Sequence, residues 1–328
     1  MRKMDSHRGK LLRIFGIQAW YAGVNIPARL FVLLLALFIV SGCRGLRPAE
    51  VKTEVKTKVI DGFSSPESVI ADRDGSRFFV SNVGVKLDPT AKDGDGFISE
   101  LKPDGVIVNR QFLPKTGVLN APKGMAIIGQ TLFVTDIDRV VGFDLSTRAQ
   151  VFELDFSAEK TVFLNDLTVF DDKTLFVSAT DTGKVYKISL GEKPSFTLLQ
   201  EGIAGANGLY YDRDSDRLFI VGFGEGTRAN GELGVIYIRD NQYKKLAGPL
   251  GFLDGVALVQ DRKIYFTDWV AFDKPGMMRV YDLMTGELSS IKLSEDVHGP
   301  ADFYYDSRNN TIWLPKMMEG KVLIERLP

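Results

Sequence analysis

The sequence predicts an all-β fold, a six-bladed β-propeller with four strands in each blade. The first observation is a pattern that occurs six times: a polar residue, an apolar strand, an Asp-rich turn and a second apolar strand. The second is the period of this pattern. Steps between equivalent residues are 56, 42, 42, 47 and 47 by subtraction of their numbers, and a period of about 45 is typical of propeller blades. The equivalent residues are Glu67, Lys123, Asn165, Asn207, Asp254 and Ala301.

The second strand of each copy carries an aromatic residue 10 to 12 positions after the equivalent residue. The last copy has room for only three strands, whereas residues 51–60 alternate apolar and polar side chains as a half-buried strand does. We therefore expect a propeller over residues 51–328, closed by this N-terminal strand as the outer strand of the last blade, which removes an exposed sheet edge. The six aromatic residues are Phe79, Phe133, Phe176, Phe219, Tyr265 and Trp313.

The N-terminal segment combines several basic residues with an uninterrupted apolar run, residues 31–40. This run is too short to span a bilayer as a helix but fits the apolar region of a secretion signal. The motif that ends at Cys43, Val-Ser-Gly-Cys, resembles the lipobox of bacterial lipoproteins. The resemblance implies a signal peptide over residues 1–43, lipidation of Cys43 and a linker over residues 44–50. The alternative is an uncleaved signal anchor with an incidental cysteine.

The residue after the cysteine bears on the location of the protein. Arg44 stands where the usual inner-membrane retention signal of lipoproteins is Asp. The lipobox resemblance therefore implies a lipid anchor in the cell envelope, in the outer membrane and facing the periplasm where the bacterium has two membranes. The membrane contact that we expect is made through this anchor only.

Composition excludes some classes of partner. The formal net charge of −1 indicates no basic face for nucleic acid. Cys43 is the only cysteine and the chain has two histidines, so neither a disulfide nor a zinc site is expected.

Four of the equivalent residues have oxygen-bearing side chains of the kind that binds hard cations. Because the innermost strands of a propeller start at one face of the central tunnel, these side chains should converge at the tunnel mouth. Two carboxylates and two amide oxygens suit Ca²⁺ better than zinc, which prefers nitrogen or sulfur, or magnesium. We expect one calcium ion, held by Glu67, Asn165, Asn207 and Asp254.

The loops between second and third strands should form the rim of a pocket on the same face. They cover residues 82–96, 180–183, 223–233, 268–277 and 317–320. Trp269, Phe272 and Met317 give this rim an apolar and aromatic character. The alternative for these three is ordinary core packing.

Glu in the first blade, Asn-Asp in the third, Asn-Gly-Leu in the fourth and Asp-Gly in the fifth resemble the SMP-30/gluconolactonase superfamily, which includes the paraoxonases. The likeness runs from about residue 51 onwards. It implies a six-bladed propeller with a calcium ion in the tunnel and hydrolysis of lactones, esters or phosphotriesters. A calcium ion with an open position can polarise a carbonyl or phosphoryl oxygen. Asp254 matches the carboxylate with a second, catalytic role.

Two departures from this pattern concern residues near the metal. Lys123 stands where the paraoxonase branch has histidine, and a lysine ammonium is repelled by Ca²⁺. It could point away, form a salt bridge with Glu67 or Asp254, act as a neutral amine base or replace the metal. Asp166 matches one ligand of a buried structural calcium, but Ser68 stands where a second carboxylate is expected, which argues against a second calcium ion.

Two further side chains are candidates for the pocket. Asp302, in the sixth blade, is a candidate partner for Lys123 across the tunnel. His298 lies three residues before Ala301 on a loop expected at the same face. It is a candidate proton shuttle or base, and the alternative is a turn residue.

Two functions from different classes follow. The first is a lipid-anchored, calcium-dependent hydrolase that acts on a small-molecule lactone or ester. The second is a non-catalytic propeller that binds a peptide, glycan or partner protein on its top face, since propellers host unrelated functions. The four oxygen-bearing side chains at the tunnel mouth, called the oxygen ring below, favour the hydrolase. The presence of Lys123 beside them and the lack of a strong base favour the binder.

Overall fold

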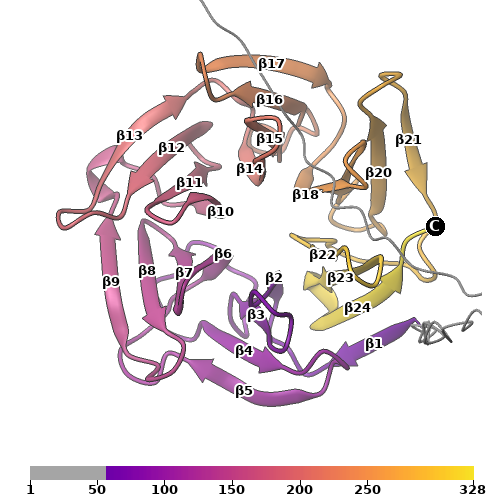
Figure 1. The fold of residues 1–328 in the computed structure, drawn as a ribbon. Coiled ribbons are helices and arrows are strands. Elements are labelled where there is room, and N and C mark those ends of the chain that lie inside the picture. Colours follow the sequence, from indigo (N-terminus) through magenta and orange to yellow (C-terminus); the bar gives the residue numbers. More distant parts are fainter. Residues whose placement is uncertain (1–56) are drawn as a thin grey trace, which may run out of the picture. The chain divides into compact units, whose positions relative to one another are not determined.

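The computed structural model describes residues 57–328, which form six four-stranded sheets around a central axis (Figure 1). The predicted all-β, six-bladed fold is confirmed. The helices within this part of the chain are two short 3-10 turns, η1 (Ser157–Glu159) and η2 (Met317–Glu319), and no helix there is long and apolar enough to cross a membrane. The predicted signal peptide, the Cys43 lipidation site, the linker and residues 51–56 of the predicted first strand lie outside the described residues.

Every blade runs from an inner strand at the axis to an outer strand at the rim, and paired strands are antiparallel. Blade 1 contains β2 (Pro66–Ala71), β3 (Phe78–Asn82), β4 (Phe97–Leu101) and β5 (Ile107–Leu113). Blade 2 contains β6 (Pro122–Ile128), β7 (Thr131–Asp136), β8 (Arg139–Asp144) and β9 (Gln150–Asp155). Blade 3 contains β10 (Leu164–Asp171), β11 (Thr174–Ala179), β12 (Lys184–Ser189) and β13 (Ser195–Gln200).

The remaining blades repeat the order, except that the sixth takes its outer strand from the start of the described chain. Blade 4 contains β14 (Ala206–Asp212), β15 (Arg217–Gly222), β16 (Leu233–Tyr237) and β17 (Gln242–Ala247). Blade 5 contains β18 (Leu253–Val259), β19 (Lys263–Asp268), β20 (Met277–Asp282) and β21 (Leu288–Ile291). Blade 6 contains β22 (Tyr304–Asp306), β23 (Thr311–Lys316), β24 (Lys321–Arg326) and β1 (Lys58–Asp61).

The ring closes through strand pairing and through packing between the first and last blades. Strand β1 pairs with β24 in an antiparallel register that sets Ile60 opposite Val322. At the inner side, Phe78 of β3 stacks on Trp313 of β23 with 4.0 Å between ring centroids. The first and last blades are therefore joined both at their outer strands and in their shared core.

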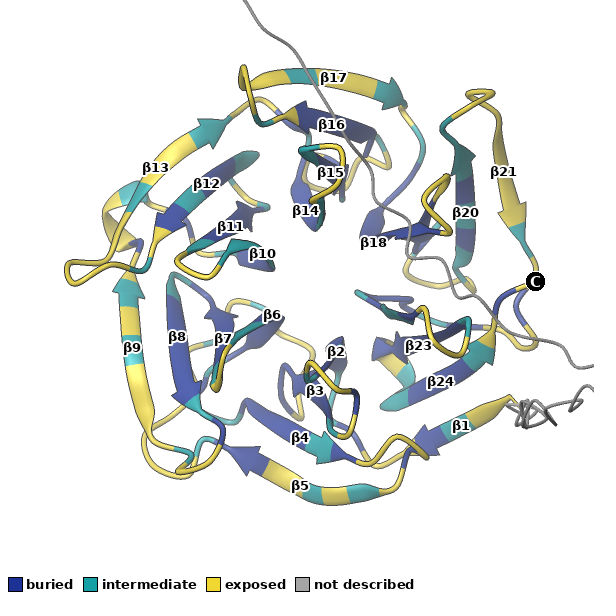
Figure 2. Cartoon of the chain, viewed as in Figure 1, coloured by how far each residue is buried: buried dark blue, intermediate teal, exposed yellow. Residues whose placement is uncertain are grey.

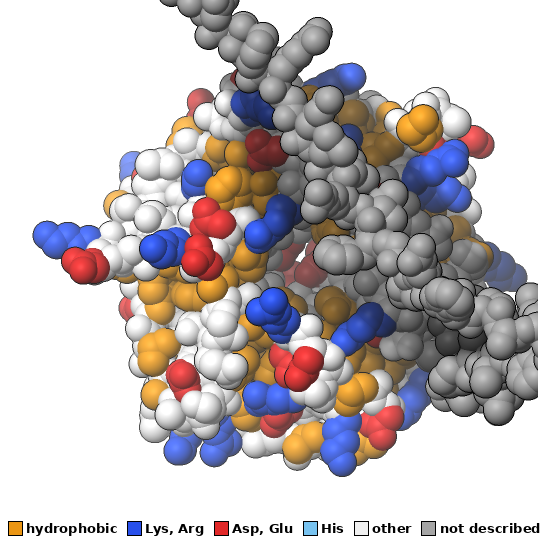
Figure 3. All heavy atoms as spheres, viewed as in Figure 1, with side chains coloured by type: hydrophobic (Ala, Val, Ile, Leu, Met, Phe, Trp, Pro, Cys, Tyr) orange, Lys and Arg blue, Asp and Glu red, His pale blue; other side chains and the backbone are white. Residues whose placement is uncertain are grey.

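The core fills the spaces between neighbouring blades. All six aromatic residues predicted in the second strands are buried, as expected from the period-2 pattern of those strands. Figure 2 shows buried residues concentrated in the inner strands and exposed residues along the outer ones. On the face drawn in Figure 3, acidic and basic side chains are intermingled around the periphery.

Candidate metal centre

A bulge at the start of five of the six inner strands positions the side chains at the tunnel mouth. In β2, β6, β10, β14 and β18 the pairing register shifts between the first and fourth residues, so that the inner strand holds one residue more than its partner. Such a bulge bends the strand and turns a side chain out of the sheet. The second residue of each bulged strand lines the same cavity; these residues are Glu67, Lys123, Asn165, Asn207 and Asp254.

Glycine follows the ring residue where neighbouring blades approach most closely. A Cβ atom on Gly208 would lie 2.1 Å from the backbone oxygen of Asp254 in the next blade, and one on Gly255 would lie 2.7 Å from Cα of Asp302. No side chain fits at these distances, so the glycines allow the inner strands to converge on the axis.

Hydroxyl groups in the second strands hold the bulges, a feature that the sequence analysis missed. Those in blades 1, 3 and 5 accept the backbone N–H that the bulge frees from the sheet ladder. Those in blades 2 and 5 donate to a carbonyl of the next blade. The signal was the Ser or Thr that follows the aromatic residue by two positions in these strands. The N–H acceptor pairs are Ser68 N with Ser81 Oγ (2.9 Å), Asp166 N with Ser178 Oγ (2.9 Å) and Gly255 N with Thr267 Oγ1 (2.8 Å).

Four buried side-chain oxygens at the tunnel mouth have no hydrogen-bond partner. They come from four different blades, and each of the residues is at most 4% exposed. Buried polar atoms are nearly always paired, so four unpaired acceptors lining one cavity point to a cation or a donor as their partner. The atoms are Glu67 Oε2, Asn165 Oδ1, Asn207 Oδ1 and Asp254 Oδ1, which belong to the four calcium ligands predicted from the sequence.

Neighbouring groups fix the orientation of two of these side chains. The Nδ2 group of Asn207 donates to the backbone oxygen of Leu253 at 3.3 Å, so the amide oxygen is the atom left free. The indole Nε1 of Trp269 donates to Asp254 Oδ2 at 2.9 Å, which leaves only Oδ1 of that carboxylate unpaired. The set therefore offers one free oxygen from each side chain, two of them on carboxylates, as a hard cation requires.

Both carboxylates have raised pKa values in the metal-free chain. The pKa of Asp254 is raised to about 8, mainly by burial and also by the charge of Asp302, while the Trp269 hydrogen bond opposes the shift. For Glu67, burial raises the pKa well above its ordinary value, with Asp254 and Asp302 adding repulsion, while Lys123 lowers it. The residues around the two carboxylates thus supply too little positive charge to stabilise their ionised forms. A divalent cation would supply that charge.

The cavity above these oxygens has a volume of about 340 Å³, within the range of small-molecule sites. Its walls are mainly apolar. Trp269 lies in edge-to-face contact with Phe223 and Phe272, with ring centroids 5.6 Å apart in both pairs. Met317 and Leu87 complete the wall. The structure therefore places Trp269, Phe272 and Met317 at the predicted pocket.

Lys123 lies in the wall of this cavity and is 1% exposed. Its Nζ donates to the backbone oxygens of Pro89 (2.8 Å) and Ala121 (2.9 Å) and lies 4.8 Å from the ring centre of Phe163. It forms no ion pair with any carboxylate in residues 57–328, so neither the predicted salt bridges to Glu67 and Asp254 nor the predicted partnership with Asp302 is present. Burial lowers the pKa of Lys123 to about 8, and the charges of Glu67 and Asp136 oppose the shift.

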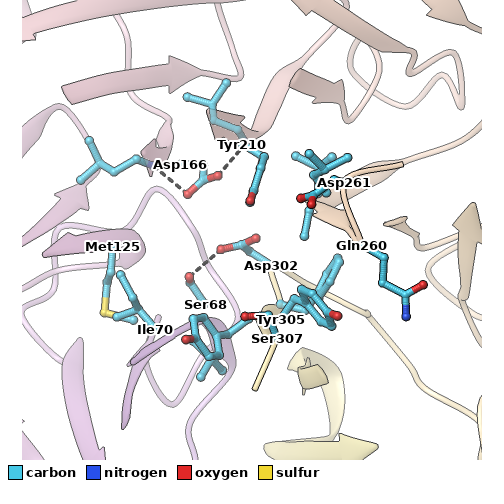
Figure 4. Close-up of a pocket in the computed structure, with 18 residues that line it drawn as sticks. Ser68, Ile70, Met125, Asp166, Tyr210, Gln260, Asp261, Asp302, Tyr305 and Ser307 are labelled. Carbon is cyan, nitrogen blue, oxygen red and sulfur yellow. Dashed lines mark hydrogen bonds between the residues drawn. The ribbon is translucent and has the colours of Figure 1, made fainter. Parts of the chain in front are cut away.

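Asp166 and Asp302 line a second cavity of about 590 Å³ instead of the one at the oxygen ring (Figure 4). Asp302 Oδ2 accepts a hydrogen bond from Ser68 Oγ at 2.6 Å. Asp166 accepts the backbone N–H groups of Leu167 (2.7 Å) and Leu209 (2.6 Å). The expectation that Asp302 reaches Lys123 was wrong because its side chain is held at this other cavity by Ser68.

The other predicted candidate, His298, does not line the cavity at the oxygen ring. Its backbone N–H donates to Glu319 Oε1 at 2.9 Å, which is the contact of a turn residue. Among the described residues no three His, Cys, Asp or Glu side chains gather as a metal site. Any metal at the tunnel mouth would therefore depend on the two amide oxygens as much as on the two carboxylates.

Similarity to known proteins establishes the fold of the chain but not its family or function. No protein-family pattern matches it, and no curated protein matches it in sequence. Among solved structures it is similar to virginiamycin B lyase from Staphylococcus aureus, with 13% identity, a TM-score of 0.58 and coverage of 83% of this chain and 99% of that one.

Two other solved structures show how varied the functions on this fold are. Hydrazine synthase of Kuenenia stuttgartiensis has 14% identity, a TM-score of 0.54 and coverage of 82% and 76%. A candidate 6-phosphogluconolactonase from Bacteroides uniformis has 11% identity, a TM-score of 0.51 and coverage of 76% and 77%. At these identities the likeness establishes a β-propeller, and the function has to be argued from the site.

Proposed function

We propose that the protein is a calcium-dependent hydrolase of lactones or esters, acting in the manner of the SMP-30/gluconolactonase superfamily. The four unpaired oxygens at the tunnel mouth carry this proposal. Oxygen ligands with two negative charges suit Ca²⁺, which would be held by Glu67, Asn165, Asn207 and Asp254. When bound, calcium would polarise the carbonyl oxygen of the ester or lactone and stabilise the charge that develops on it.

The side chains of the cavity would bind the substrate and keep water from it. The aromatic wall around Trp269 offers an apolar surface to the acyl or leaving group. Among the three candidate bases, Asp254 alone presents an unpaired acceptor atom to the cavity, whereas the nitrogen of Lys123 is engaged and His298 lies elsewhere. We therefore assign to Asp254 the acceptance of a proton from the attacking water, a role that Oδ1 would combine with calcium binding because Trp269 holds Oδ2.

Calorimetry on EDTA-treated protein tests the metal site directly. We expect one calcium site that Glu67→Gln and Asp254→Asn each abolish, while Asp88→Asn, which removes an exposed carboxylate near the same cavity, preserves it. Hydrolysis of aryl esters and lactones should disappear with the metal and return when calcium is added. A folded wild-type protein that binds no calcium would exclude this function.

A non-catalytic role as a cell-envelope binder is the second candidate, favoured by apolar side chains exposed on loops of the cavity face. Leu87, Phe272 and Met318 are 42%, 50% and 45% exposed, and such residues mark interaction sites when they lie together. A propeller that binds a peptide, glycan or partner protein through them would retain binding in the Glu67→Gln and Asp254→Asn variants. The same two variants therefore separate the candidates.

We also propose that the protein is lipid-anchored through Cys43 in the bacterial cell envelope. This proposal rests on the lipobox resemblance alone. Metabolic labelling with a palmitate analogue should mark the wild-type protein but not a Cys43→Ala variant, and fractionation should move the variant out of the membrane fraction. Labelling that persists in the variant would exclude Cys43 as the anchor.

A further inference from the structure

Lys123 is a buried cation for which the described chain supplies no counter-ion. Its ammonium group contacts two backbone oxygens and the face of Phe163, and no carboxylate pairs with it. Contact with an aromatic face favours the charged ammonium over the neutral amine. Because a buried charge without a partner is destabilising, a lysine in this position is well suited to bind an anion from outside the chain.

Of the carboxylates whose charges act on Lys123, Glu67 acts most strongly and belongs to the proposed calcium site, and the other three are engaged with other groups. Asp136 accepts the backbone N–H of Ala121 at 2.9 Å and pairs with Arg139 at 2.8 Å. Asp181 accepts the hydroxyl of Thr161 at 2.6 Å, and Asp88 accepts the hydroxyl of Thr90 at 3.0 Å. None of these carboxylates forms an ion pair with Lys123, which lines the cavity at the tunnel mouth.

The charge balance of the loaded site points the same way. With calcium bound, the two positive charges of the ion would offset the two negative charges of Glu67 and Asp254. Lys123 would then carry the one uncompensated charge among the cavity-lining residues. A low-dielectric cavity with a single net positive charge favours a ligand with a single negative charge.

We propose that the substrate is an apolar ester or lactone that also carries one free carboxylate, and that Lys123 binds this carboxylate. The aromatic wall around Trp269, Phe223 and Phe272 holds the apolar body of the molecule. This proposal rests on the proposed function for the charge balance and names the substrate class of the same site. Lys123 is then a specificity-determining residue, because it distinguishes acidic from neutral esters of the same shape.

The test compares two probes of nearly equal shape, 4-phenylbutyrate and its neutral amide, by titration calorimetry on the calcium-loaded full-length protein. We expect the wild type to bind the carboxylate at least about tenfold more tightly than the amide. Lys123→Gln should lose this preference while its affinity for the amide stays the same. Lys123→Arg keeps the charge and should retain a preference. Lys86→Gln, which removes an exposed cation from the loop that contains Pro89, is the matched control and should behave as the wild type.

Calcium affinity, measured on the same samples, separates this proposal from the function on which it rests. Normal calcium binding by Lys123→Gln shows that the variant is folded and that the metal ring is intact. If the wild type binds calcium but shows no preference for the carboxylate, the proposed carboxylate subsite is overturned and the proposed calcium site stands. A preference that persists in Lys123→Gln would place the carboxylate on the calcium ion and would also overturn it. Absence of calcium binding in the wild type would instead reject the hydrolase proposal.

Discussion

Trp269 connects the apolar wall of the cavity to the oxygen ring. Its indole packs among Phe223, Phe252 and Phe272, while its Nε1 donates to Asp254 Oδ2 at 2.9 Å. A hydrogen bond to a charged group contributes about 1.5 to 3 kcal/mol. We expect Trp269→Phe to weaken calcium binding by roughly 10- to 100-fold in calorimetry, because Asp254 is then free to rotate. Phe223→Leu, which removes a neighbour without a hydrogen bond, should leave the affinity within a factor of about three; equal losses in both variants would contradict the positioning role.

Asp254 also makes the metal-free protein sensitive to pH. Burial raises its pKa to about 8, compared with about 3.9 in an unfolded chain. Between these values the folded state keeps a proton that the unfolded state has released, so the stability present below about pH 4 is lost as the pH rises through about 8. From pH 5 to pH 8 in EDTA, the midpoint of thermal unfolding should fall more steeply for the wild type than for Asp254→Asn. Calcium should remove the difference, and parallel slopes in EDTA would refute the assignment.

At the scale of the element, the bulged starts of five inner strands bring together the residues at the tunnel mouth, and a substitution of Gly208 tests this arrangement. A Cβ atom there would meet the backbone oxygen of Asp254 at 2.1 Å, so the two blades would have to separate. We expect Gly208→Ala to lower the free energy of unfolding by about 1 to 3 kcal/mol in a denaturant titration and to weaken calcium binding. Gly191→Ala, where the nearest atom lies 3.9 Å from the added Cβ, is the control and should have neither effect. An unchanged Gly208→Ala variant would show that the inner strands are less closely packed than described.

The same elements explain how much of the site could be predicted from the sequence. The residues at the tunnel mouth follow the repeat, because the second residue of each bulged inner strand reaches the axis in the same way. Asn165 and Asp254 line one cavity for this reason. The partners of Lys123 could not be predicted, since they are a loop carbonyl at Pro89 and a ring face, and neither leaves a side-chain pattern. Asp302 follows Ala301, the equivalent residue of the sixth blade, by one position, and this difference of one residue places its side chain at the other cavity.

At the scale of the whole molecule, closure of the ring holds the first and sixth blades together. Strand β1 covers the edge of β24, and Ile60 packs in one cluster with Phe63, Val322 and Ile324. A backbone hydrogen bond from Phe63 to Gly320, 3.1 Å long, adds a further link between the two ends. Without β1, the edge of β24 would present unpaired backbone groups to solvent and to other copies of the chain.

Two truncations that differ only in β1 test this closure. Removal of residues 1–56 leaves every described strand in place and should preserve a single cooperative unfolding transition. Removal of residues 1–61 deletes β1 and should lower the unfolding midpoint by at least about 5 °C, because the burial of Ile60 and the pairing of four residues with β24 are lost. It should also increase aggregation in light scattering through the exposed β24 edge. Equal midpoints for the two truncations would mean that the Phe78–Trp313 stack and the inner strands close the ring without β1, and the ring oxygens should then still bind calcium with unchanged affinity.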